Sequence, residues 1–244
     1  MIQEPIHTLK IPTVCKISKR LTKKQFIENF SLKAHEKKLL SSDVESITLE
    51  YLLNKDNINI TPFVDEEYDY SEVAFIKVEL SNLNKFKSIA NIIQYIPYPL
   101  IVFFSYKDSF CINLSPKRIN KNDSTKLVVE ESLFTKWLNL HSITQLEKDF
   151  IKSLEIQNHP FTDFLSFYNS YIDTIVAFNA SVYSGSLNVH EDTKVILDEI
   201  AICETKIIEL KNKIKKETNF NDKVSMNIEL KKVKDKLNKL KSKI

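Results

Sequence analysis

Four carboxylates lie close together in the first third of the chain: Asp65, Glu66, Glu67 and Asp69. Restriction-type nucleases commonly place an acid on one strand and an E-x-K motif on the next, because this pattern holds magnesium and directs water. The strands that we predict next, at 100–106 and 109–114, carry no E-x-K motif. Three E-x-K matches lie after residue 203, where a lysine-rich segment produces them by composition. The sequence therefore favours a solvated loop, with a divergent metal-dependent nuclease as an alternative.

A single glycine, Gly185, excludes several common catalytic folds. P-loops and dinucleotide-binding turns need several glycines so that the backbone can approach phosphate. The G-x-S-x-G turn of serine hydrolases needs two. The five histidines show no i, i+3 or i, i+4 spacing, and no C-x-x-C or H-E-x-x-H motif is present. We therefore expect no bound cofactor and no classical zinc site.

The three cysteines, Cys15, Cys111 and Cys203, are scattered and odd in number. This pattern favours reduced thiols and a cytoplasmic protein. The N-terminus lacks the charged and apolar regions of a signal peptide. The longest nearly apolar run, 95–104, is too short to span a membrane.

Basic residues gather before the first predicted helix: Lys16, Lys19, Arg20, Lys23 and Lys24. Such a cluster can contact nucleic-acid phosphates without reading bases. The net charge is +3, but residues 206–244 hold thirteen lysines against five acids. No recognised nucleic-acid-binding motif accompanies either region. A sequence-independent nucleic-acid-binding module is therefore a further alternative to a solvated surface.

Hydrophobic periodicity predicts an α+β fold with an α/β-like N-terminal sheet. Alternating apolar residues predict strands at 47–53 and 73–80, and helical spacing predicts helices at 22–40 and 81–96. Pro97 ends the second helix, and the apolar run at 100–104 is typical of a strand covered on both faces. We therefore predict a parallel βαβ unit, followed by a β-hairpin that turns at residues 107–108.

We predict three regions: a mixed sheet domain at 1–140, a pair of helices packed on the sheet at 141–183, and a coiled-coil appendage at 184–244. In the appendage, apolar residues recur with the 4-3 spacing of a coiled-coil seam. The seam residues that we expect to bind a partner are Ile200, Ile207, Leu210, Ile214, Leu230, Val233, Leu237 and Leu240. Because the two stripes are out of phase, a break near 219–221, with Asn221 as an N-cap, favours an antiparallel hairpin over one long helix.

Several stretches resemble an uncharacterised bacterial family, domain-of-unknown-function family 4391. They are "ISKRLTKKQF", "VESITLEYLLNKDNINI", "IPYPLIVFF" and "KKETNFNDKVSMNIELKKVKDKL". The resemblance runs from about Lys16 to the end of the chain. Members of this family are often encoded beside helicases and DNA methyltransferases in restriction-like or phage-defence clusters. The family offers no active-site residues to transfer.

The resemblance and the seam together suggest a non-enzymatic accessory or adaptor subunit. Its C-terminal helices would bind a helicase, a methyltransferase or a second copy of the chain. Burial of the seam residues would drive this binding, and the surrounding lysines would tune its rate and salt dependence.

Overall fold

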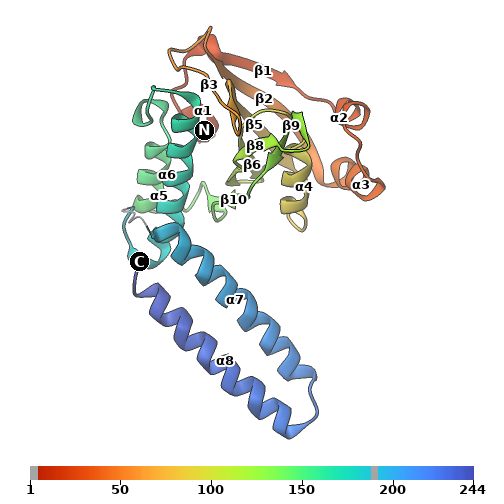
Figure 1. Ribbon diagram of the computed structural model, residues 1–244, viewed down its shortest axis with the longest axis vertical. Coiled ribbons are helices and arrows are strands. Elements are labelled where there is room, and N and C mark those ends of the chain that lie inside the picture. Colours follow the sequence, from red (N-terminus) through yellow and green to blue (C-terminus); the bar gives the residue numbers. More distant parts are fainter. Residues whose placement is uncertain (1–4, 188–191) are drawn as a thin grey trace. The chain divides into compact units, whose positions relative to one another are not determined.

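The computed structural model describes residues 5–187 and 192–244, and the chain divides into two compact units, Met1–Ile175 and Val176–Ile244. The boundary lies inside the long helix α6 (Phe164–Ser184). The first unit is a mixed α+β structure, and helices make up the second (Figure 1). Within the described residues, we find no helix with the length and apolar character needed to cross a membrane.

The main sheet has seven strands in the order β1-β2-β5-β6-β7-β10, and β11 also pairs with β7. Their bounds are β1 (Lys16–Arg20), β2 (Val44–Asn54), β5 (Glu72–Leu80), β6 (Leu100–Tyr106), β7 (Ser109–Leu114), β10 (Leu133–Phe134) and β11 (Leu138–Asn139). β5 and β6 are parallel, with Ala74 opposite Leu100, and β6 and β7 form an antiparallel hairpin. The predicted βαβ unit and β-hairpin are therefore confirmed.

Two short β-ribbons lie outside this sheet. One pairs β3 (Phe63–Val64) with β4 (Asp69–Tyr70), and the other pairs β8 (Lys117–Asn120) with β9 (Asp123–Val129). The first ribbon places the predicted acidic loop at its turn.

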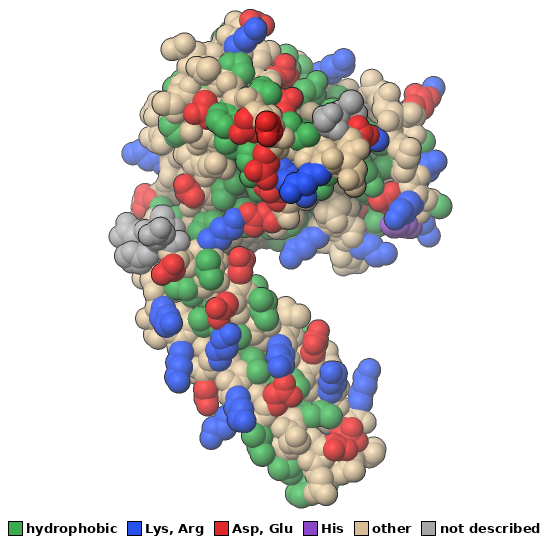
Figure 2. Space-filling view, viewed as in Figure 1, with side chains coloured by type: hydrophobic (Ala, Val, Ile, Leu, Met, Phe, Trp, Pro, Cys, Tyr) green, Lys and Arg blue, Asp and Glu red, His purple; other side chains and the backbone are tan. Residues whose placement is uncertain are grey.

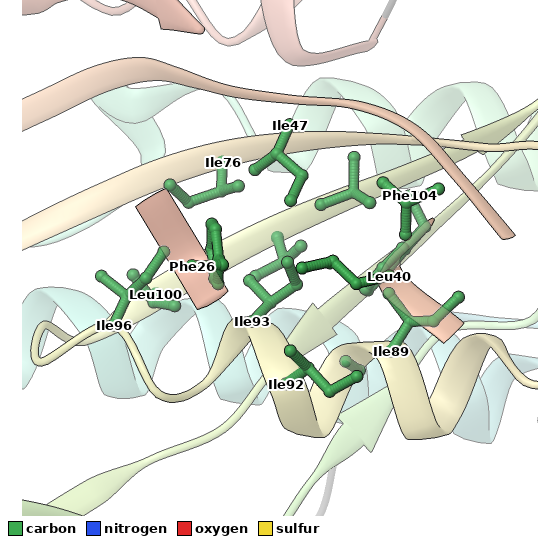
Figure 3. Close-up of a cluster of buried hydrophobic side chains, with 14 of the residues drawn as sticks. Phe26, Leu40, Ile47, Ile76, Ile89, Ile92, Ile93, Ile96, Leu100 and Phe104 are labelled. Carbon is green, nitrogen blue, oxygen red and sulfur yellow. The ribbon is translucent and has the colours of Figure 1, made fainter. Parts of the chain in front are cut away.

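One face of the main sheet packs against α2 (Lys23–Asn29), α3 (Ala34–Asp43) and α4 (Phe86–Ile93), as Figure 3 shows for ten labelled residues. Alternate residues of β5 point into this core, while α4 supplies residues such as Ile89 and Ile93. The single helix predicted at 22–40 is wrong, because the backbone is extended at Phe30 and a new helix begins after Lys33. Leu32, in the connection, is buried in the same core.

The other face carries aromatic contacts to α6. Phe75 of β5 packs edge-to-face on Tyr171, and the Tyr168 hydroxyl donates to the Leu100 carbonyl at 2.9 Å. The remaining helical segments of this unit are α1 (Pro5–Thr8), α5 (Gln145–Ser153), and the 3₁₀ turns at Thr13–Cys15 and Ile156–Asn158.

The second unit contains an antiparallel hairpin of α7 (Thr193–Lys216) and α8 (Phe220–Lys241). Ion pairs join the two helices across the hairpin: Glu199 with Lys236, Glu204 with Lys241, and Lys206 with Glu229. The predicted break therefore falls at the right place, but the cap differs. Asn219, not Asn221, is the N-cap of α8, and its side chain accepts from the Asn221 amide at 2.9 Å.

We predict that Leu230→Ala selectively loosens the hairpin. Leu230 is buried against Ile207 and Leu210, so its truncation should lower local stability by about 2–3 kcal/mol. Native-state hydrogen exchange should then show faster exchange in α7 and α8 and unchanged exchange in β5 and β6. Ile228→Ala, at an exposed position of the same helix, is the matched control. Equal effects of the two variants would contradict the packing described above.

Candidate functional site

The acidic cluster forms a solvated turn rather than a ligand sphere. Asp65 Oδ1 accepts from the amides of Glu67 and Tyr68 at 2.8 and 2.7 Å, and Asp69 Oδ1 accepts from the Ser71 hydroxyl at 2.6 Å. All four predicted carboxylates, including Glu66, are exposed. Across residues 5–187 and 192–244, no three His, Cys, Asp or Glu side chains form a group that could hold a metal ion. The observed contacts of Asp65 and Asp69 stabilise the turn.

A carboxylate–lysine pair that the sequence reasoning did not single out lies on β5. Lys77 Nζ contacts Glu79 Oε1 at 2.7 Å, and the Ser46 hydroxyl of β2 donates to the other Glu79 oxygen. These hydrogen bonds hold the pKa of Glu79 below its ordinary value. In the sequence, the alternation along 73–80 already indicates that Lys77 and Glu79 lie on the same face of one strand. The Lys77 ammonium and the Glu79 carboxylate satisfy each other's hydrogen-bonding groups. We therefore assign the pair a structural role on the sheet surface.

The predicted basic residues lie on the free edge of the sheet and on the helix that follows it. Lys16, Lys19 and Arg20 belong to β1, whose five residues are all exposed. Lys23 Nζ donates to the Ser41 carbonyl at 3.0 Å, and Lys24 pairs with Glu28 at 3.6 Å. The structure therefore brings three exposed cations to one edge strand, while the α2 lysines also make contacts within the helical layer.

An apolar cavity of about 310 Å³ opens on the α2 side of the sheet. Its residues come from β2, β5, α2 and the loop before β6, and they are Leu21, Gln25, Phe26, Asn29, Phe30, Leu49, Leu52, Ala74, Ile76, Ile96 and Tyr98. Tyr98 is 40% exposed. Beside the cavity, Tyr95 stacks on Phe30 with ring centroids 6.0 Å apart. The cavity forms from segments distant in the chain, so no local sequence pattern defines it.

The seam residues, predicted to bind a partner, pack inside the hairpin. Ile200 and Leu240 lie in one buried cluster, Ile207, Leu210 and Leu230 in a second, and Ile214, Val233 and Leu237 pack against them. The opposite helix covers this stripe, so a partner reaches it only if α7 and α8 separate. We therefore assign these eight residues to the hairpin core.

A second apolar stripe faces outward on α8. We call it the outer ridge, and it consists of Phe220, Val224 and Ile228, which are 75%, 42% and 54% exposed. Their i, i+4, i+8 spacing places them along one face of the helix. Figure 2 shows lysine side chains, interspersed with acidic ones, along the visible face of the hairpin. Lys231 and Lys232 follow the ridge in sequence and are exposed.

Buried thiols offer no reactive nucleophile. Burial raises the pKa of Cys111 to about 12, and its Sγ donates to the Thr135 carbonyl at 3.2 Å. Burial also raises the pKa of Cys15. Both thiols stay protonated at neutral pH, so neither supplies a reactive thiolate.

Lys117 is a buried titratable group near the end of α4. Its Nζ donates to the carbonyls of Gln94 and Ile96 at 3.0 and 2.6 Å, and its amide donates to the Tyr70 hydroxyl. Burial lowers the pKa of Lys117 to about 7, because the surroundings disfavour the charged form. Lys117 does not line the apolar cavity. Its contacts identify it as a cap for the carbonyls that follow α4.

We predict that Lys117→Met changes the pH dependence of stability. The folded chain releases the Lys117 proton near pH 7, whereas the unfolded chain holds it until about pH 10.5. The unfolded state therefore binds more protons between these values, so Lys117 makes stability rise with pH, by at most about 1.4 kcal/mol per unit. Denaturant titrations from pH 7.0 to 9.5 should show a flatter profile for Lys117→Met than for the wild type. Lys121→Met, at an exposed position, should keep the wild-type profile; identical slopes for Lys117→Met and wild type would refute this account.

Comparison with known proteins identifies a family but no characterised relative. No curated protein and no solved structure matched the chain. The model of one family, described as a domain of unknown function (DUF4391), matches residues 9–237. This match covers most of the mixed sheet unit and the helical hairpin, so the chain belongs to the DUF4391 family.

Proposed function

We propose that this protein is a non-enzymatic adaptor that docks a larger protein on the outer ridge of its helical hairpin. The outer ridge is the observation that carries the proposal. Three large apolar side chains on one exposed helix face are typical anchors for a protein partner. The seam residues hold α7 and α8 together, and the outer-ridge residues are not among them. A partner could therefore cover the outer ridge without opening the hairpin.

Burial of the outer ridge can provide useful binding energy. A fully buried Val, Ile or Phe side chain contributes about 1.5–3 kcal/mol relative to an exposed one. Ordering and association costs consume part of this gain, so three anchors favour a moderate, reversible interaction. The thirteen lysines after residue 205 would accelerate association with an acidic partner surface and make it salt-dependent.

The partner class is a further part of the proposal. We propose a helicase or a DNA methyltransferase of a bacterial restriction-like or antiphage defence system, acting in the cytoplasm. This part of the proposal depends on the family's gene neighbourhood, and the ridge itself requires only a complementary apolar surface. Self-association through the same ridge would be the competing outcome, and light scattering of the isolated chain distinguishes it.

We predict that the double substitution Val224→Glu and Ile228→Glu abolishes co-purification of the partner. The tagged full chain and a candidate helicase or methyltransferase would be expressed together and recovered on affinity resin. Two carboxylates in the interface should reduce recovery at least tenfold, because buried unpaired charges are strongly unfavourable. Undiminished recovery would count against the adaptor proposal.

The matched control is Ser225→Glu combined with Asn221→Glu, which adds the same charge to exposed polar positions of α8. Circular dichroism should show equal helix content in both variants. If the control abolishes recovery as fully as the ridge variant, the effect is due to charge and the outer ridge is not the docking surface.

A second candidate function is sequence-independent nucleic-acid binding by β1. Its support is the position of Lys16, Lys19 and Arg20 on an exposed edge strand, with no acidic residue within that strand. Cations at such an edge can follow a phosphate backbone without entering a groove.

For this second candidate, we predict that Lys16→Gln with Arg20→Gln reduces both affinity and salt dependence. Each lost phosphate contact should lower the slope of log affinity against log salt by about 0.7 for a single strand or 0.9 for a duplex. Fluorescence anisotropy with a labelled oligonucleotide at several salt concentrations measures this slope. An affinity that does not depend on salt, or the same slope in the variant and the wild type, would contradict nucleic-acid binding by β1.

A further inference from the structure

Three parts of the fold line the apolar cavity: the sheet, helix α2 and the loop before β6. Leu49, Leu52, Ala74 and Ile76 of β2 and β5 form its floor, α2 forms one wall, and Ile96 and Tyr98 form the other. Figure 3 shows Phe26, Ile76 and Ile96 gathered at one end of the core cluster. Nine of the eleven lining residues are apolar or aromatic, and the two others are the amides Gln25 and Asn29. This composition is typical of a recognition pocket with few polar contacts.

A cation lies beside the cavity floor because of an irregularity in β1. Lys16 pairs with Tyr51 and Lys19 with Leu49, so β1 uses one more residue than β2 across this interval. Ser18, within the resulting bulge, has a φ of 47°. Residues that pair directly across an antiparallel ladder project on the same face. Lys19 therefore shares a sheet face with Leu49, at the edge of the apolar floor.

The chain around the cavity is strongly basic. Residues 16–38 contain eight lysines and arginines against two glutamates. Gln25 accepts with its Oε1 from the Thr22 amide at 2.8 Å as part of the α2 cap. Its NH₂ group is therefore the part of the side chain that can donate to a ligand. The cavity thus combines an apolar interior with donors and positive charge around it.

We infer that this cavity docks a segment of a partner protein that presents one large apolar side chain next to an aspartate or glutamate. The volume of about 310 Å³ lies at the lower end of ligand sites and equals the share of roughly ten water molecules. It suits one anchor side chain. Lys19 would attract the neighbouring carboxylate, and charge complementarity between the basic 16–38 segment and an acidic peptide would add to the attraction.

A random-peptide phage library, selected on the full chain, tests this inference. Leu52→Trp, which adds bulk at the cavity floor, serves as the counter-selection target. Peptides enriched on the wild type over Leu52→Trp should share an aromatic residue or leucine beside Asp or Glu. A fluorescein-labelled synthetic copy of one such peptide then gives affinities by anisotropy. No enrichment over the filled variant, or a consensus without an acidic residue, would overturn the inference.

Four variants of the full chain separate the contributions. Lys19→Glu should lower the affinity for the labelled peptide at least fivefold. Lys24→Glu, at a side chain that is 82% exposed on α2, should change this affinity less than twofold. Leu52→Trp should lower the peptide affinity more than twentyfold and leave the circular dichroism spectrum unchanged. Because Lys19 is exposed, its variant tests the charge contact even if Leu52→Trp misfolds.

The fourth variant, Val224→Glu, keeps this result separate from the hairpin proposal, because it should leave peptide affinity unchanged while it disrupts the outer ridge. Equal weakening by Lys19→Glu and Lys24→Glu would show attraction to general positive charge and would overturn the docking site.

Discussion

The parallel pairing of β5 with β6 is the constraint on which the N-terminal unit depends. Parallel neighbours require a crossover, and α4 provides it by returning across one face of the sheet. This covers the β5 and β6 residues that point to the α2–α4 side, while Phe75 packs on Tyr171 on the other side. Both central strands are therefore buried, which explains the continuous apolar run at 100–104.

The same crossover positions two features that are otherwise unrelated. Its descending loop supplies Ile96 and Tyr98 to the cavity wall, and the carbonyls of Gln94 and Ile96 to the ammonium of Lys117. A buried lysine whose ammonium contacts backbone carbonyls resembles a catalytic group in its lowered pKa. Its hydrogen bonds explain it as a cap for the end of α4, because carbonyls at a helix end attract cations. A shifted pKa therefore indicates a catalytic role only when the group also faces a cavity that could hold a substrate.

The hairpin illustrates how one amphipathic pattern can be read in two ways. A 4-3 repeat indicates that a stripe will be buried, and we expected a partner to bury it. In the structure, α7 and α8 bury the stripe against each other, and ion pairs such as Glu199–Lys236 flank the contact. The short connection at 217–219 makes this intramolecular pairing favourable, because closing a short loop costs little entropy. Apolar residues outside the repeat, such as Phe220 and Ile228, remain exposed on α8.

The sequence by itself determined the local elements: the helix that ends before Pro97, the strands on both sides of it, and the break that separates α7 from α8. These depend on residue type and spacing over a few turns, which a single sequence carries. Only the tertiary structure decided what each face contacts. The bulge at Ser18 and the cavity between β2, β5 and α2 arise from pairing between distant segments, and the two seams bury each other when α7 and α8 pack together. A repeat shows that a face will be buried, but long-range packing selects what covers it.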